Sequence, residues 1–179
     1  NQKLSKHLDI IDKEITRSDE VIQRLLQITK GENLKKTTAD LKEIAEEAFN
    51  YANLEEKATL HIDYETKPFA VKLDKLLIRQ VFYNLFLNSI QAMSGSGKVY
   101  LRIKKEPNNH ASISIKDEGI GISENDLGKI FNLLFTNKKN GIGLGLSICK
   151  DLILRHQGSI DVKSSPNIGT TFFIKIPIR

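Results

Sequence analysis

The apolar positions of residues 1–30 follow a helical pattern. This stretch contains neither glycine nor proline, and a single seam of side chains recurs at steps of three and four residues. Such spacing predicts one long helix with an apolar stripe. Because a lone helix of this kind is marginal in water, the seam also predicts a helical partner. Its members are Leu4, Leu8, Ile11, Ile15, Ser18, Ile22, Leu25 and Thr29.

After Gly31 the pattern shortens into alternating helices and strands. Residues 34–38 predict a strand, and Asp40 with Glu43 has the spacing of a capping box that starts a helix reaching about Lys57. The alternation that follows predicts two short strands, one holding Leu60, Ile62 and Tyr64 and the other holding Val71 and Leu73.

Residues 73–93 predict a longer helix that carries two asparagines on one face. Asp74 stands at the N-cap position, and Asn84 and Asn88 are four residues apart. Buried asparagines can simply satisfy loop carbonyls, or an amide oxygen can bind Mg²⁺ that bridges nucleotide phosphates. We favour a divided role, with Asn88 as the metal ligand and Asn84 as a structural partner. The apolar positions of this helix are Leu77, Val81, Leu85 and Ala92.

An acidic residue followed by two glycines comes next. Two alternating strands, at residues 99–103 and 113–115, deliver Asp117 at the end of the second, with Gly119 and Gly121 just beyond it. Glycines let the backbone pass close to a flat ligand. Because a carboxylate only accepts hydrogen bonds, it favours a purine with an exocyclic amine over one with a carbonyl there. The pattern therefore predicts an adenine site.

A second glycine cluster opens the last predicted helix. Gly141, Gly143 and Gly145 run directly into an apolar-periodic segment that Gly158 ends. Unpaired N–H groups at such a helix start can hold phosphate, although the cluster alone is equally typical of a flexible loop. Beyond the helix, residues 160–164 and 170–177 predict an antiparallel strand pair.

Composition narrows the class of protein. An apolar fraction of 40% with four prolines indicates a folded chain, and neither a membrane span nor a signal peptide is visible. Cys149 is expected to be a core residue in a reducing cytoplasm, and His156 to stabilise the end of the last helix. The net charge of +5 is spread along the chain, so nucleic-acid binding is poorly motivated. No His, Cys or acidic cluster suggests zinc.

The order and spacing of these segments are specific in combination. An asparagine-bearing helix, two strands, Asp-x-Gly-x-Gly, a Phe-containing segment and a Gly-rich helix start resemble the N, first glycine, F and second glycine boxes of the sensor histidine kinases. These kinases share an ATPase superfamily with gyrase and MutL-type repair proteins. The resemblance implies an α+β fold: a two-layer sandwich whose mixed, largely antiparallel sheet is covered on one face by helices. It further implies part of a dimerisation domain at residues 1–31 and an ATP-binding catalytic domain at residues 32–179.

The resemblance also implies a site for ATP and Mg²⁺, with the metal on Asn88. Phe131 and Phe135 resemble the F box, although the family's proline is missing between them and both can equally be core residues. The segment from Phe135 to Gly141, the expected lid, is short. The implied ATP-binding residues are Asn84, Asn88, Gln91, Asp117, Gly119, Gly121, Ile122, Phe131, Thr136, Lys138, Gly141, Gly143, Leu144, Gly145, Leu146 and Thr170.

The implied activity is transfer of the ATP γ-phosphate to a histidine of a helical bundle, and onward to an aspartate of a response regulator. Nothing around His7 resembles the phosphoacceptor motif, so we expect this chain alone to bind ATP without autophosphorylation. Dimerisation through the N-terminal helical region and a cytoplasmic place in a protein that can be membrane-anchored follow from the same resemblance. Alternatives are a serine kinase of the anti-sigma-factor type, a non-catalytic ATP-sensing or dimerising module and, more distantly, a nucleic-acid-binding module.

Overall fold

The computed structural model describes residues 7–8, 33–51, 53–64, 69–138 and 141–178. The predicted helix of residues 1–30 therefore lies outside the described residues, apart from His7 and Leu8, which are helical and exposed. The predicted boundary between residues 31 and 32 stays a prediction for the same reason.

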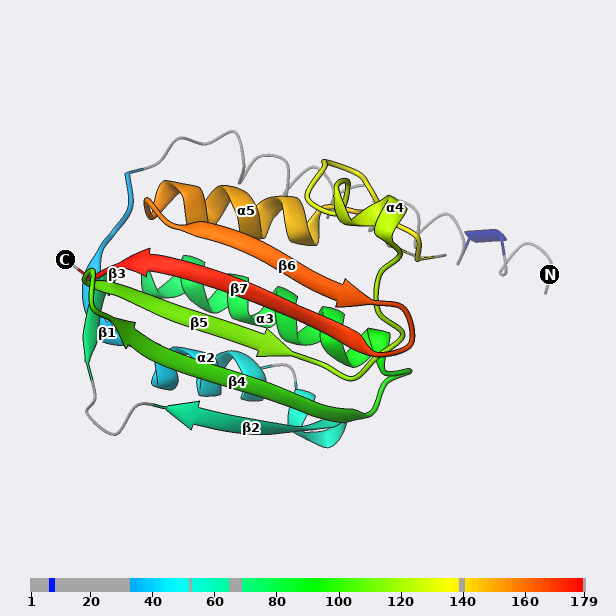
Figure 1. Cartoon of the computed structure of the whole chain (residues 1–179), viewed down its shortest axis with the longest axis horizontal. Helices are drawn as coiled ribbons and strands as arrows, with labels where there is room; N and C mark the ends of the chain where they lie inside the picture. Colours follow the sequence, from blue (N-terminus) through cyan, green and yellow to red (C-terminus); the bar gives the residue numbers. More distant parts are fainter. Residues whose placement is uncertain (1–6, 9–32, 52, 65–68, 139–140, 179) are drawn as a thin grey trace.

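The described residues form a mixed five-stranded sheet in the order β2-β4-β5-β7-β6 (Figure 1). Only β2 and β4 run parallel, and the other neighbours pair antiparallel. The strands are β2 (Ala58–Tyr64), β4 (Gly97–Glu106), β5 (His110–Lys116), β6 (Ser159–Ser165) and β7 (Gly169–Pro177).

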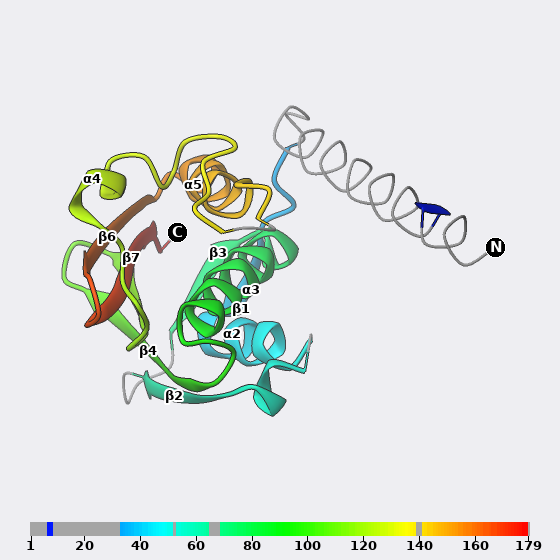
Figure 2. The ribbon, with the colours of Figure 1, turned by 90° about the vertical axis from the view of Figure 1, so that its right-hand side faces the viewer.

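Three helices cover one face of this sheet (Figure 2). They are α2 (Leu41–Asn50), α3 (Lys75–Ala92) and α5 (Gly145–Arg155). Strand residues alternate between buried apolar side chains and polar ones, so one face packs and the other meets solvent. The predicted two-layer fold is confirmed. The core between the layers includes Ile44, Phe82, Phe86, Ile148, Ile153, Val99, Leu101, Ile103, Ile113, Ile115, Phe172 and Ile174.

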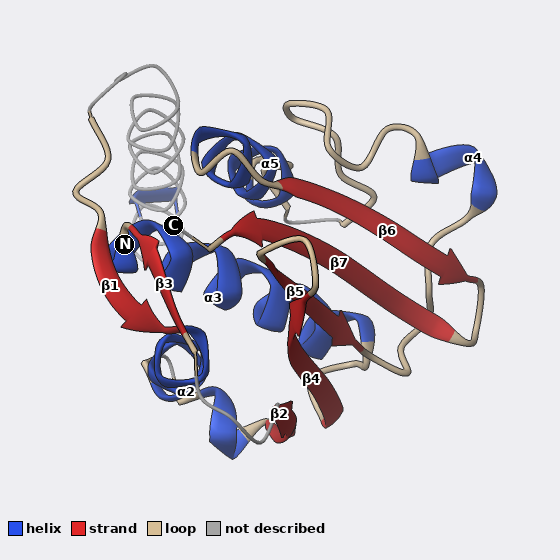
Figure 3. Cartoon of the chain, turned by 60° about the vertical axis from the view of Figure 1, so that its left-hand side comes forward, coloured by secondary structure: helices blue, strands red, loops and turns tan. Residues whose placement is uncertain are grey.

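A separate two-stranded sheet stands at one end of the helical layer (Figure 3). It pairs β1 (Thr37–Asp40) with β3 (Ala70–Leu73), so the predicted strand at residues 34–38 begins and ends later than expected. The helix predicted to reach Lys57 was too long, because α2 ends at Asn50. Asn53 then adopts a left-handed conformation (φ 50°), which a helix cannot continue through, and a single 3-10 turn follows at Leu54–Glu56.

Aspartates cap both helices, as the sequence predicts. At α2, Asp40 Oδ1 accepts from the N–H of Lys42 at 2.7 Å, which places the bond one residue earlier than in the expected capping box. At α3, Asp74 Oδ1 accepts from the N–H of Leu77 at 3.3 Å. Asp74 Oδ2 also accepts from the N–H of Lys35, so this cap anchors the segment that precedes β1.

His156 does contact the end of α5, as expected, but it does so as a neutral ring and not as a charge on the helix dipole. Its imidazole is buried, and Nε2 lies 3.0 Å from the N–H of Asp74 while Nδ1 lies 2.7 Å from the carbonyl oxygen of Leu152. Because Nε2 accepts a hydrogen bond, the ring is neutral and bridges the end of α5 to the start of α3. Burial accordingly lowers the pKa of His156 from its ordinary value.

This burial predicts a pH-dependent stability. Below about pH 6.5 the unfolded chain binds a proton at His156 before the folded chain does, so the free energy of unfolding should fall with pH by up to about 1.4 kcal/mol per unit. Above about pH 6.5 the neutral His156 contributes its full share to the free energy of unfolding. Urea unfolding between pH 5 and 8 measures it, and His156→Gln should lose that part of the slope. Identical slopes in the two proteins would contradict the assignment.

Candidate functional site

One face of α3 organises the candidate site. Asn84, Asn88, Gln91 and Ala92 are spaced so that they lie along the same side of the helix. Asn84 lies beside the start of α5, since its side-chain Oδ1 is 3.9 Å from where a Cβ on Gly145 would stand. The last turn of α3 contacts the loop after β5, because the N–H of Ile120 donates to the carbonyl oxygen of Ala92 at 3.0 Å.

Asp117 follows β5 directly, where the sequence predicts it, and only 1% of its surface is exposed. Its Oδ1 accepts from the N–H groups of Gly119 at 3.0 Å and Thr170 at 3.1 Å. Burial raises the pKa of Asp117, whereas these two donors favour the charged form. Both bonds end on Oδ1, which leaves Oδ2 for a ligand or for the nearby hydroxyl of Ser89.

Ser89 is a site residue that the sequence analysis missed. Its hydroxyl is buried and makes no hydrogen bond of acceptable geometry to any described residue. It nevertheless lies near enough to Asp117 to lower the pKa of that carboxyl. A serine inside an apolar helix gives no pattern of its own, and its position directly after Asn88 was the only available signal.

Packing requires glycine at positions 119 and 121, just after Asp117. A Cβ on Gly119 would lie 2.7 Å from backbone atoms of Ala92. At Gly121, φ is +70° and a Cβ would lie 2.1 Å from the carbonyl oxygen of Ser165. The loop is therefore pressed between the end of α3 and the β6–β7 hairpin. That the same glycines admit a flat ligand stays a prediction.

The start of α5 has the form expected of an anion site. No side chain caps its first turn among the described residues. Gly143 has φ +74°, and a Cβ there would meet the backbone of Leu134 at 2.4 Å. Leu144 is buried, whereas Gly145 and Leu146 are half-buried. N–H groups of the first turn thus remain available to phosphate oxygens.

Lys138 is the described residue that joins the Gly-rich segment to α3. Its Nζ lies 2.7 Å from Oδ1 of Asn88 and 2.5 Å from Oε1 of Gln91. The residue as a whole is exposed, but its ammonium is held between these amides, and loss of hydration lowers the pKa of Lys138. Two side-chain oxygens that hold one ammonium form a donor set suited to a hard cation, so the residues present fit Mg²⁺. Thr136 Oγ1 accepts from the N–H of Lys138, and a Cβ on Gly141 would meet that oxygen.

The two phenylalanines of the Phe-containing segment pack against the core of the domain. Phe131 meets Phe172 edge-on with ring centroids 6.5 Å apart, and Phe135 packs against the core. These contacts favour core packing, the alternative left open above. Leu133 and Leu134 between them are exposed. Leu134 adopts φ 63°, an unusual conformation for a leucine, and Gly143 packs directly against its backbone.

Ser123 stands at the N-cap position of α4 (Glu124–Leu127), but its side chain accepts no hydrogen bond from the first turn of that helix. Its hydroxyl instead donates to Oδ2 of Asp126 at 2.7 Å, and Asn137 donates to the same oxygen at 2.8 Å. The carboxylate of Asp126 thereby connects α4 to the residue before Lys138.

Ser164 supports the base of the site and was also missed by sequence reasoning. Its hydroxyl accepts from the N–H of Ile122 at 2.8 Å, lies 2.9 Å from Oγ1 of Thr170 and is 2.8 Å from the carbonyl oxygen of Gly169. Ile122 and Thr170 are thus held to one strand pair. Alternating polar residues on an outer strand carry no signal for such a role.

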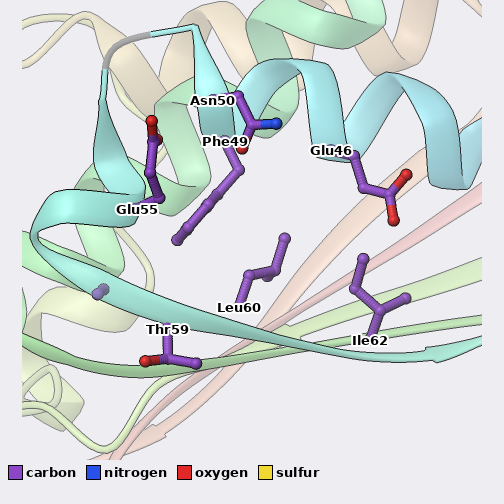
Figure 4. Close-up of a pocket in the computed structure, with 8 residues that line it drawn as sticks. Glu46, Phe49, Asn50, Glu55, Thr59, Leu60 and Ile62 are labelled. Atoms are coloured by element: carbon purple, nitrogen blue, oxygen red, sulfur yellow. The ribbon is translucent and has the colours of Figure 1, made fainter.

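A groove elsewhere on the molecule has different chemistry (Figure 4). It lies between α2 and the edge strand β2, and its lining includes the apolar Phe49, Leu60 and Ile62 together with Glu46 and Glu55. Two carboxylates disfavour a phosphate there. Within the described ranges, no group of three His, Cys, Asp or Glu side chains is placed to hold a metal ion, and no helix is long and apolar enough to cross a membrane.

Comparison with known proteins identifies the family. Residues 73–179 match the family model described as histidine kinase-, DNA gyrase B- and HSP90-like ATPase. The chain belongs to this ATPase family. The catalytic domain of the histidine kinase ThkA has 30% sequence identity and a TM-score of 0.70, with 80% of this chain and 96% of that chain covered. The described chain therefore has the fold of a histidine-kinase ATP-binding catalytic domain.

Curated relatives of this ATPase domain are longer. The signal transduction histidine-protein kinase AtoS of Escherichia coli is 31% identical over 177 residues, which are 97% of this chain and 29% of that protein. Sporulation kinase A of Bacillus subtilis is 33% identical over 96% of this chain and 29% of its own length. The chain thus spans less than a third of the length of these two kinases.

Proposed function

We propose that this domain binds Mg·ATP and serves a longer protein that transfers the γ-phosphate to a histidine on a helical bundle, for relay to a response-regulator aspartate. The observation that carries the proposal is a convergence on α3. The Asp117 loop contacts its last turn, the α5 start lies beside Asn84, and Lys138 reaches Asn88.

Each element has a distinct role in this proposal. Asp117 selects adenine, the first turn of α5 holds phosphate oxygens, and Asn88 holds Mg²⁺. The metal would neutralise charge on the phosphates. Lys138 adds a mobile positive charge near the same oxygens. The domain supplies position and electrostatic stabilisation, which is what phosphoryl transfer chiefly requires. A place in the cytoplasm and pairing of the complete protein through residues 1–31 belong to the same proposal.

The direct test supplies an acceptor histidine on a second protein. The domain, γ-labelled ATP and Mg²⁺ are mixed with a separate histidine-bearing helical bundle from a related kinase. We expect an acid-labile phosphoprotein on the bundle and no stable label on this chain. If the label instead appears as acid-stable phosphoserine on the protein that was added, the serine kinase of the anti-sigma type is favoured. Mg·ATP binding without any transfer would favour the sensing module.

Asn88→Ala should remove the dependence of ATP affinity on Mg²⁺. The fold should survive because the side chain is half-buried and its recorded partner is the exposed Lys138. Loss of a metal ligand should lower affinity for Mg·ATP by at least about tenfold, with little change in the presence of a chelator. Calorimetric titration with and without Mg²⁺ measures both. Equal Mg²⁺ dependence in the variant and the unmodified protein would remove Asn88 from the metal site.

A further inference from the structure

The contact that carries a further inference is the one in which Asn88, Gln91 and Lys138 meet. The two amide oxygens come from successive turns of α3 and converge on one ammonium, at 2.7 Å and 2.5 Å. Asn88 is half-buried and Gln91 is exposed, so water is an available partner for both. Their convergence on a single positive charge therefore marks a position where a cation is favoured.

We infer that Gln91 is a second oxygen ligand of the nucleotide-associated cation and that the ammonium of Lys138 fills the same position when Mg²⁺ is absent. The inference rests on the proposed function and deepens it. Cation and ammonium compete for one pair of oxygens, so Gln91 and Lys138 together set the concentration of Mg²⁺ that the domain needs.

The dimensions of the contact agree with this exchange. Mg²⁺ prefers oxygen ligands at about 2.0–2.1 Å and retains several waters alongside one or two protein oxygens. Rotation of the two flexible side chains would let their amide oxygens hold Mg²⁺ in place of the ammonium. A glutamine offers the same carbonyl chemistry as asparagine with one more methylene of reach.

Between the amide oxygens of Asn88 and Gln91, Mg²⁺ is favoured over the Lys138 ammonium only when phosphates are present. The two protein ligands are neutral amides, so they supply dipoles without a net negative charge. The nucleotide supplies the negative charge that makes Mg²⁺ preferable to a single ammonium. Lys138, once displaced, can pair with the phosphates instead. The exchange thus moves one positive charge from the amides to the nucleotide.

Three variants separate the parts of this inference. Gln91→Leu removes the oxygen at nearly constant size, Gln91→Glu adds charge at the same place, and Lys138→Met removes the competing ammonium. Lys104→Met is the matched control, because Lys104 is exposed on the outer face of β4 and loses the same charge. A fluorescent ATP analogue at saturating concentration is titrated with MgCl₂ to find the half-saturating Mg²⁺ concentration.

Gln91→Leu should raise that concentration about tenfold, the usual cost of losing a supporting metal contact. Gln91→Glu and Lys138→Met should lower it, and Lys104→Met should leave it unchanged. The inference is overturned if Gln91→Leu leaves the half-saturating concentration unchanged while Asn88→Ala still abolishes Mg²⁺ dependence. Should Asn88→Ala also have no effect, the proposed function itself is at fault.

A second readout needs neither metal nor nucleotide. Amide hydrogen exchange across residues 132–138, measured in EDTA, reports the contact of Lys138 with α3. Gln91→Leu and Lys138→Met should each speed exchange there, and the double variant should exchange no faster than Lys138→Met alone, because that change already removes both amide contacts. Additive effects would mean that the two side chains act separately, which contradicts the shared position.

Discussion

Asp117→Asn should lower the affinity for ATP by roughly 100-fold while the domain stays folded. The amide keeps an oxygen that can accept from Gly119 and Thr170, so the bond within the loop and the bond to β7 both survive. In place of Oδ2 it presents an N–H₂ donor toward the exocyclic amine of adenine. Two donors facing each other in a buried place cost about 3 kcal/mol, which is the stated loss.

Titration in EDTA measures this loss without the metal. Asp117→Ala is a poorer variant, because it also leaves the N–H groups of Gly119 and Thr170 without their shared acceptor. Its loss of affinity should therefore be accompanied by a lower thermal midpoint, whereas Asp117→Asn should unfold near the temperature of the unmodified protein. ATP affinity within threefold of normal for Asp117→Asn would show that adenine binds elsewhere.

Gly121→Ala should be more damaging than any other added methyl group in the loop that follows β5. The backbone is left-handed there, which costs an alanine about 1–2 kcal/mol. The new Cβ would also stand 2.1 Å from the carbonyl oxygen of Ser165, so the loop must leave the β6–β7 hairpin. We expect a total loss of about 3 kcal/mol in the free energy of unfolding, together with weaker ATP binding.

Two other glycines supply matched controls for that experiment. Gly95 has φ +95° but nothing within 4 Å of a Cβ, so Gly95→Ala isolates the conformational cost. Gly128 has neither a positive φ nor a close neighbour, and Gly128→Ala should be nearly neutral. Urea unfolding of all three variants should rank Gly121 well above Gly95, and Gly95 above Gly128. If Gly121→Ala and Gly95→Ala lower the free energy of unfolding equally, then the close approach to Ser165 adds nothing to the conformational effect.

Local patterns predicted most of the elements because their causes are local. Helical period and an N-cap aspartate located α3, and alternation located β2, β4 and β5. Where a boundary was wrong, the cause was still a short-range conformation that pattern does not report. The left-handed Asn53 after α2 and the left-handed Gln157 after α5 are such cases. At α5, Gly158 is needed for space beside Lys175 and not for a positive φ.

The sequence by itself determined the kinds of side chain at the site, their order and the family to which the chain belongs. Only the tertiary structure decided what those side chains contact. Gly121 packs on Ser165, Gln91 meets Lys138, and His156 accepts a bond from Asp74, a residue 82 positions earlier. Periodicity and capping reflect forces over a few residues, whereas these contacts depend on where the folded chain returns to itself.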